Sequence, residues 1–500
     1  MRVFSTVIMM VACAARLSGT ATSTTLERIE VAPDHWTFRE SQSHRPFVPF
    51  GVNYTPSWSG WAPDYLSTEK FDIERITADF DRMRDLGVNV CKVVFSGKRM
   101  LPDPQTSDGA VLDNGCLQRF DQVLAIAAQR GVRLLATFEI AWHGGAPNWF
   151  NQNGRWFGAR PRRTLVDFWK QFATRYRDDG RIFAYSFCVE TALRDWDTTA
   201  SLDAWRDWAK VRYGTIPIAN AEWGTTFTEW AQIPAAGVDG KNSPDWRARP
   251  EGTDENENKT NDAFLYDFML FREHAAFHYM VSQTRAVKSV DPQALCTMGF
   301  IQWGILHRSY GKTYEGPLFG IEYNAHELAR AFDFVGIHFY PTFTADRGDE
   351  TQLQCLELWA RWAFRGKPVI LEEFNMYPVE RNPVWCEKAI RHSQRYVSGW
   401  LTWTFQNVPN SDDITKVCGL YDAGDNLTAW GTKFRELSAE VRGWKLEREK
   451  SLRTVRADKK FLLTSGRYHD FLDELLASDS QAVDFHMESN PSIDRLLRAH

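Results

Sequence analysis

Short apolar segments alternate with amphipathic ones along most of this 500-residue chain. The apolar segments predict eight buried strands, and residues between them carry apolar side chains at helical spacing. Strands that alternate with helices favour a parallel sheet with helical crossovers. Eight such units in about 360 residues predict a (β/α)8 TIM barrel. The strands are expected at residues 46–54, 88–95, 132–142, 181–190, 294–301, 332–340, 367–374 and 397–405.

Two segments extend the expected barrel. A long insertion at about residues 192–262 follows the fourth strand, so we expect it to overhang the barrel mouth. Residues 447–500 are charged and predict a partly helical extension whose role is open. The barrel domain is therefore expected over residues 25–446. A doubly wound open sheet is the structural alternative, but no G-x-G-x-x-G follows an early strand.

The first residues are typical of a targeting segment. Arg2 precedes an apolar run at residues 3–12, followed by small and polar residues. This pattern predicts a secretory signal over residues 1–24, too short to span a bilayer. Cys13 lies in a loose match to a bacterial lipoprotein box, which we favour less than ordinary cleavage. No later segment has the apolar length of a transmembrane helix, so we expect a secreted or periplasmic protein.

Composition and spacing exclude several classes of partner. The chain has 59 basic and 64 acidic residues, which argues against a nucleic-acid-binding surface. No C-x-x-C spacing occurs, and no H-x-H follows the first strand, so we expect no metal and no cofactor. One disulfide among Cys355, Cys386 and Cys418 is left open. The 21 Trp residues fit a protein that stacks rings on sugars, although most of them are expected in the core.

Carboxylates end two of the predicted strands. Glu190 ends the fourth strand, and the adjacent Glu372 and Glu373 end the seventh. Working groups of a TIM barrel lie at these carboxyl ends. Two carboxylates across an aromatic mouth are the layout that retaining glycoside hydrolysis needs. Because strand side chains alternate, Glu372 and Glu373 should face opposite sides, and both sides of this strand are apolar.

Residues 45–445 resemble the clan A glycoside hydrolases, retaining (β/α)8 enzymes that include cellulases, mannanases and β-galactosidases. The order and strand placement of several motifs carry the resemblance. They are GRIFAYSFCVET, DFVGIHFYP, KPVILEEFN and GWLTWTF for strands four, six, seven and eight, and GLYDAGDNLTAWG for the closing segment. Residues 205–230 are similar to a segment of the family 42 β-galactosidases.

The resemblance implies roles for the two carboxylates. Glu190 takes the place of the clan's acid/base. The clan's nucleophile directly precedes an aromatic residue, which selects Glu373 before Phe374. Glu372 is then expected to point towards the surrounding helices and to pair with a Lys or Arg. A structural ion pair is the alternative for each carboxylate.

The chain departs from the clan pattern at two positions. Val189 stands where the clan has an Asn that contacts the sugar 2-hydroxyl, and Lys92 stands where Arg is frequent. A Lys is a point charge and cannot make the bidentate fork of Arg. The resemblance also places His338 and Tyr340 near the nucleophile, although a buried core histidine is the alternative for His338.

The sequence thus predicts an exported retaining β-glycoside hydrolase that acts on a polysaccharide or oligosaccharide. A non-catalytic carbohydrate-binding protein on a degenerate barrel is the alternative, motivated by the two departures. Galactosides, glucans and mannans remain open as substrates. The expected sugar-binding residues are Asn53, Tyr54, Lys92, Trp142, His143, Val189, His338, Tyr340 and Trp403.

Overall fold

Eight parallel strands close into a barrel, which confirms the predicted (β/α)8 fold. The computed structural model describes residues 26–60, 64–102, 109–140, 145–190, 198–235, 263–301, 328–341, 349–363, 366–376, 379–447, 453–457, 471, 474 and 480–485. The barrel strands, in their order around the closed sheet, are β10 (Val369–Phe374), β11 (Gly399–Thr402), β4 (Phe50–Asn53), β5 (Val90–Ser96), β6 (Arg133–Glu139), β7 (Ile182–Val189), β8 (Cys296–Phe300) and β9 (Val335–Phe339).

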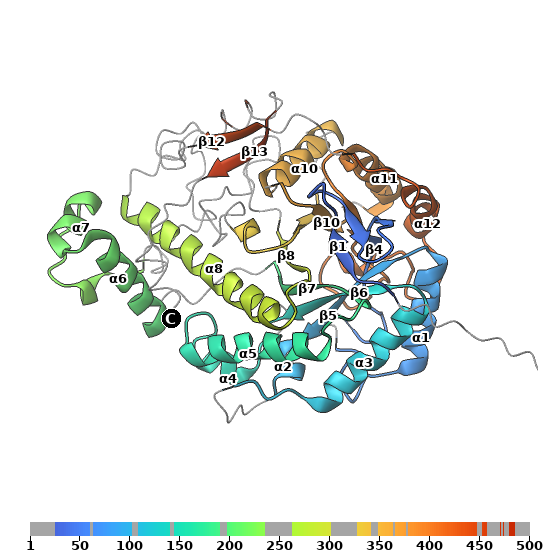
Figure 1. Cartoon of the computed structure of the whole chain (residues 1–500), viewed down its shortest axis with the longest axis horizontal. Helices are drawn as coiled ribbons and strands as arrows, with labels where there is room; N and C mark the ends of the chain where they lie inside the picture. Colours follow the sequence, from blue (N-terminus) through green and yellow to red (C-terminus); the bar gives the residue numbers. More distant parts are fainter. Residues whose placement is uncertain are drawn as a thin grey trace, which may run out of the picture.

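Helices surround this barrel (Figure 1). Helix α1 illustrates how local sequence sets them: Asp72 caps its first turn, Ile76, Phe80 and Met83 form its buried face, and Gly87 follows its end at a φ of 77°. The long helices are α1 (Ile73–Asp85), α3 (Asn114–Gln129), α5 (Ala159–Arg175), α8 (Ala263–Val290), α10 (Asp349–Ala363), α11 (Asn382–Ser393) and α12 (Ala429–Val441). The short ones are α2 (Gly97–Met100), α4 (Asn148–Gln152), η6 (Val379–Arg381) and η7 (Ile414–Lys416).

A small antiparallel sheet covers the N-terminal end of the barrel. It consists of β1 (Ile29–Val31), β2 (Phe38–Glu40) and β3 (Pro46–Phe47). Phe38 packs edge-on against Phe183 and Phe334, with ring centroids 5.5 Å apart in both pairs. The strand predicted at residues 46–54 is therefore two strands, of which only β4 belongs to the barrel. The sheet closes this end with apolar side chains, so the opposite end is the one that can bind a ligand.

The described part of the predicted insertion is helical. It forms α6 (Thr199–Tyr213), α7 (Ile216–Trp223) and the short η1 (Trp230–Gln232). Trp205 lies at the centre of their contact with α8, with Phe268 and Phe271 each within 5.5 Å, centroid to centroid. Figure 1 places α6 and α7 on the outer side of α8. Residues 236–262 lie outside the described part, so the expected overhang of the mouth stays a prediction.

The C-terminal extension contains strands that the sequence did not predict. It contains two parallel strands, β12 (Arg453–Ala457) and β13 (Ser480–Phe485), and β13 lies against α10. Within the predicted helix, the structure describes residues 471 and 474, and both are helical. Cys386 and Cys418 are free and buried. Within the described ranges, no helix is both long and apolar enough to cross a bilayer.

Candidate active site

The lower interior of the barrel is apolar, and the level above it is charged. Val90 of β5 and Ile370 of β10 belong to the apolar cluster beneath the site. Because strand side chains alternate, the residues two positions further on face the interior as well. These residues are Lys92 and Glu372, both fully buried and joined by an ion pair of 2.6 Å. The prediction that Glu372 points towards the helices is therefore wrong, although its pairing with a Lys is confirmed.

A β-bulge explains why both adjacent glutamates face the interior. Leu371 pairs with Ile337 of β9 and Glu373 pairs with His338, so Glu372 has no partner of its own. Such an extra residue interrupts the alternation of side chains and re-aims the next one. A similar irregularity lies between Ser186 and Val189 of β7, just before Glu190. Sequence periodicity does not reveal a bulge, which depends on the partner strand.

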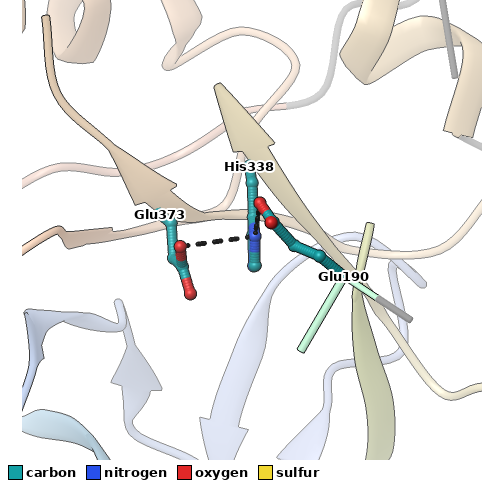
Figure 2. Close-up of side chains that lie close together, drawn as sticks. All are labelled: Glu190, His338 and Glu373. Carbon is teal, nitrogen blue, oxygen red and sulfur yellow. Dashed lines mark hydrogen bonds and ion pairs between the residues drawn. The ribbon is translucent and has the colours of Figure 1, made fainter. Parts of the chain in front are cut away.

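Glu190 and Glu373 approach each other across the mouth (Figure 2). One carboxylate oxygen of Glu190 lies within 4.8 Å of one carboxylate oxygen of Glu373. Retaining glycosidases hold their carboxyl groups about 5–5.5 Å apart, whereas inverting enzymes need about 6.5–9.5 Å. The backbone of Glu190 has a φ of 47°, in the left-handed region that glutamate seldom adopts. Strained backbone of this kind is common at functional positions.

His338 lies between the two carboxylates, as Figure 2 shows. Its Nδ1 is 2.8 Å from Oε1 of Glu190 and 3.4 Å from Oε2 of Glu373. Burial would lower the pKa of the imidazole, but the neighbouring carboxylates, Glu373 foremost, outweigh it and raise the pKa to about 9. His338 is thus a cationic group of the site near neutral pH. It is also fully buried with polar contacts at both ring nitrogens, so the predicted place near the nucleophile and the alternative of a buried core histidine both describe it.

Lys92 is the cation on which the carboxylates of β10 converge. Its Nζ lies 2.7 Å from Oε1 of Glu373, 2.6 Å from Oε1 of Glu372 and 3.4 Å from Nε2 of His338. Burial alone would lower the pKa of Lys92, but the two carboxylates raise it above its ordinary value. Lys92 and His338 are both fully buried, so they contact the carboxylates and not a sugar. Their predicted sugar contacts are therefore corrected.

Two aromatic residues complete the described mouth. The hydroxyl of Tyr340 donates a hydrogen bond of 2.6 Å to Oε2 of Glu373. The indole of Trp403 is half-buried, and its Nε1 donates to Oγ1 of Thr415 at 2.8 Å. That hydrogen bond sets the orientation of the ring, so its exposed part is available for stacking. Sugar contact by Trp403 stays a prediction.

The structure corrects the two predicted sugar contacts at the end of β4. The amide of Asn53 is fully buried and donates to the carbonyl oxygens of Glu372 and Thr402, at 2.9 and 3.2 Å. Tyr54 points into the helical layer, where its hydroxyl donates to Oδ2 of Asp79 at 2.7 Å. Neither side chain is exposed at the mouth, because the first holds strand backbones together and the second lies outside the barrel.

Three further residues, Val189, Trp142 and His143, are predicted to contact sugar. Val189 is half-buried at the end of β7, next to Glu190, where its side chain offers no hydrogen-bonding atom. Trp142 and His143 lie outside the described residues. Their predicted contacts with sugar therefore stay predictions.

Glu190, His338 and Glu373 are also a geometric candidate for a metal site. Their ligand atoms lie within 4.8 Å of one another, and the described ranges contain no other such group. A divalent cation here would meet the ammonium of Lys92, which already lies 2.7 Å from Glu373. It would also require His338 to lose its proton. The arrangement therefore favours acid–base chemistry over metal binding.

Family models match two overlapping parts of the chain. The β-galactosidase model of glycoside hydrolase family 42 matches residues 159–389, and the cellulase model of glycosyl hydrolase family 5 matches residues 42–223. No curated protein matches the chain. The family matches confirm the expected resemblance to glycoside hydrolases, and they support an enzyme that hydrolyses glycosidic bonds.

Solved structures share the barrel. A β-galactosidase from Rahnella sp. R3 is 15% identical, with a TM-score of 0.62 over 87% of this chain and 64% of its own. An exo-β-1,4-mannosidase from Opitutaceae bacterium strain TAV5 is 16% identical, with a TM-score of 0.56 over 86% and 65%. A family 5 glycoside hydrolase of Bifidobacterium longum, in complex with Manβ1-4GlcNAc, is 14% identical, with a TM-score of 0.57 over 90% and 94%. This chain therefore spans just under two thirds of the galactosidase and of the mannosidase.

Proposed function

We propose that this protein is a retaining β-glycoside hydrolase in which Glu190 is the acid/base and Glu373 the nucleophile. The observation that carries the proposal is the approach of their carboxylate oxygens to within 4.8 Å at the open end of the barrel. An approach this close fits the spacing of a retaining enzyme better than the wider spacing of an inverting one. The family matches to a β-galactosidase and a cellulase support the same reaction class.

The first half of the reaction is glycosylation of Glu373. A carboxylate oxygen of Glu373 attacks the anomeric carbon, and Glu190 gives its proton to the leaving oxygen as the glycosidic bond breaks. Lys92 and Tyr340 hold the attacking carboxylate through hydrogen bonds of 2.7 and 2.6 Å. These contacts fix its orientation before substrate binds, which lowers the entropic cost of attack.

The second half is hydrolysis of the glycosyl-enzyme. Glu190, now ionised, takes a proton from water as the water oxygen attacks the anomeric carbon from the face that the leaving group vacated. The bond from that carbon to Glu373 breaks, and Glu373 leaves as a carboxylate. Nδ1 of His338 lies 2.8 Å from Glu190 Oε1 and can donate a hydrogen bond to the ionised carboxylate. Two inversions give net retention of the β configuration, and the protons balance over the cycle.

We propose β-linked oligosaccharides or polysaccharides as substrates, with β-galactosides and β-mannosides as the first to test. The names of the relatives support this choice: β-galactosidase, exo-β-1,4-mannosidase, and a family 5 enzyme in complex with Manβ1-4GlcNAc. We also propose that the chain is exported, supported by the apolar run at residues 3–12.

The test is hydrolysis of aryl β-glycosides and β-linked glycans by the wild type, Glu373→Gln and Glu190→Ala. We expect loss of activity in Glu373→Gln. Glu190→Ala should keep activity on aryl glycosides with good leaving groups. Added azide should raise its turnover, and the product should then be a β-glycosyl azide. Glu357→Gln is the control, because it removes a carboxylate that pairs with Arg361 in α10, outside the barrel.

Two results would contradict the proposal. An α-configured first product would exclude retention. Binding of glycans without cleavage by the wild type would favour the carbohydrate-binding alternative.

A further inference from the structure

The double displacement does not use Glu372, yet this carboxylate is fully buried directly beneath the proposed catalytic pair. Leaving a carboxylate ionised in a barrel interior is costly unless cations stabilise it. Two do so: Nζ of Lys92 lies 2.6 Å from Oε1 of Glu372, and Nε2 of His338 lies 3.7 Å from the same oxygen. The cations outweigh the effect of burial and lower the pKa of Glu372 to about 2.

The four buried groups form a ring of alternating charge. Lys92 contacts Glu372 at 2.6 Å and Glu373 at 2.7 Å. His338 contacts the same two carboxylates, at 3.7 and 3.4 Å. Each cation therefore lies between the same two anions, and each anion between the same two cations. We call these four residues the charge ring.

Two glycines on neighbouring strands make room for the charge ring. A Cβ at Gly336 of β9 would lie 1.7 Å from Oε2 of Glu372, and a Cβ at Gly299 of β8 would lie 2.4 Å from Nε2 of His338. The two glycines pair with each other across the strands. Glycine weakens a strand, and inside one it often marks the close approach of another group. Here the approaching groups are Glu372 and His338 of the charge ring.

We propose that Glu372 is a positioning residue of this glycosidase site: it holds Lys92 against the nucleophile and holds the protonated form of His338 beside the acid/base. This inference rests on the proposed function. Glu372 touches no substrate, so it acts through Lys92 and His338. Without its charge, Lys92 would interact with Glu373 alone and make that carboxylate a weaker nucleophile. His338 would also lose one of its stabilising anions.

The inference also predicts a change in the proton affinity of His338. The charged groups that face the imidazole are Glu190 from the end of β7, Glu372 and Glu373 from β10, and Lys92 from β5. Removing one of three carboxylates while keeping the ammonium should make protonation harder. A purely structural ion pair between Lys92 and Glu372 would affect stability and leave kcat unchanged, so the kinetics separate the two roles, whereas the His338 pKa tests the contact itself.

The first measurement requires no substrate. NMR of protein labelled at histidine would follow the 12 histidines through a pH titration, with His338 assigned by its loss in His338→Gln. We expect Glu372→Gln to lower the pKa of His338 by about one pH unit or more. Gly336→Ala should act in the same direction by displacing Glu372, and it provides the test if Glu372→Gln fails to fold. Glu357→Gln, the control outside the barrel, should leave the pKa unchanged.

The second measurement is steady-state kinetics of the same variants. We expect kcat to fall at least about tenfold in Glu372→Gln with KM within about twofold, because the lost interaction acts on the reacting carboxylate and not on bound sugar. Glu372→Asp keeps the charge and should restore part of kcat. An unchanged kcat in a folded Glu372→Gln would overturn the inference, whatever the pKa of His338. A wild type that cleaves nothing, with a His338 pKa that still falls in Glu372→Gln, would refute the proposed function and leave the charge ring supported.

Discussion

Tyr340 donates its phenolic hydrogen to Oε2 of Glu373 across 2.6 Å, while Lys92 binds the other oxygen of that carboxylate at 2.7 Å. Lys92 belongs to β5 and Tyr340 directly follows β9, so the orientation of Glu373 depends on closure of the barrel. A carboxylate held at both oxygens cannot rotate away from the mouth. The kinetic consequence can be tested one donor at a time.

Tyr340→Phe removes one donor and keeps the ring. A hydrogen bond to a charged group contributes about 1.5–3 kcal/mol, so we expect kcat/KM to fall by roughly 10- to 100-fold. Steady-state kinetics on an aryl β-glycoside would measure this fall in kcat/KM. Tyr65→Phe is a matched control, because it removes a buried hydroxyl that donates to the carbonyl of Val94 outside the site. Equal losses of kcat/KM in the two variants would argue against a role for Tyr340 in holding the nucleophile.

Lys92→Met leaves two carboxylates in the barrel interior without their shared ammonium. Breaking a buried ion pair in this way costs about 3–5 kcal/mol. The lowered pKa of Glu372 means that its ionised form stabilises the fold above its ordinary pKa of 4.5, and that this contribution is lost as pH falls towards about 2. We therefore expect the difference in unfolding free energy between wild type and Lys92→Met to be largest near neutral pH and to shrink below pH 4.5.

Urea titrations at several pH values would measure that difference. Lys288→Met is the control, because Lys288 pairs with Asp333 at 2.8 Å but is partly exposed. Partly exposed pairs contribute about 0–1 kcal/mol, so its effect should be much smaller. If Lys92→Met lost no more stability than the control, Lys92 would not be a stabilising member of the charge ring.

His338 should make stability depend on pH in the opposite direction. Its pKa is raised from 6.5 to about 9, so its contribution is fully present below pH 6.5 and is lost as pH rises through about 9. Relative to His338→Gln, the wild type should lose stability over this window, by up to a few kcal/mol. Denaturant unfolding of both proteins from pH 6 to 10 would reveal it. A constant difference across that range would show that the imidazole gains no proton affinity in the folded barrel.

Val189→Asn restores the side chain that the clan resemblance leads one to expect next to the acid/base. Val189 is half-buried beside Glu190 and cannot hydrogen-bond a sugar. One added hydrogen bond to a substrate hydroxyl is worth about 1 kcal/mol, so we expect kcat/KM to rise several-fold. The gain should disappear with the matching 2-deoxy aryl glycoside. Val189→Thr, which is closer in size to valine, would separate this contact from a change of volume.

The barrel itself follows from local patterns. Apolar segments of strand length, separated by amphipathic segments, occur along the chain, and parallel strands with helical crossovers are the arrangement that buries them. Closure then brings the carboxyl ends of all strands to one face. For that reason the strand pattern alone predicts that Glu190 and the adjacent Glu372 and Glu373, which are far apart in the chain, lie at one end of the barrel, and the clan resemblance then selects Glu373.

The directions of individual side chains were decided by tertiary structure. Both faces of β10 are apolar, so alternation alone could not tell which glutamate faces the axis, and the bulge against β9 turned both of them inward. Gly299 and Gly336 leave space for a buried group at this level, and only the pairing of β8 with β9 identifies what fills it.

Sequence alone determined the fold class and the strand ends that carry the proposed catalytic carboxylates, because both depend on patterns within single segments. Tertiary structure alone decided the charge ring, the outward turn of Tyr54 and the strand pair of the C-terminal extension. Each of these depends on register between segments distant in the chain, and register is set by the partner strand and not by the residues of one strand.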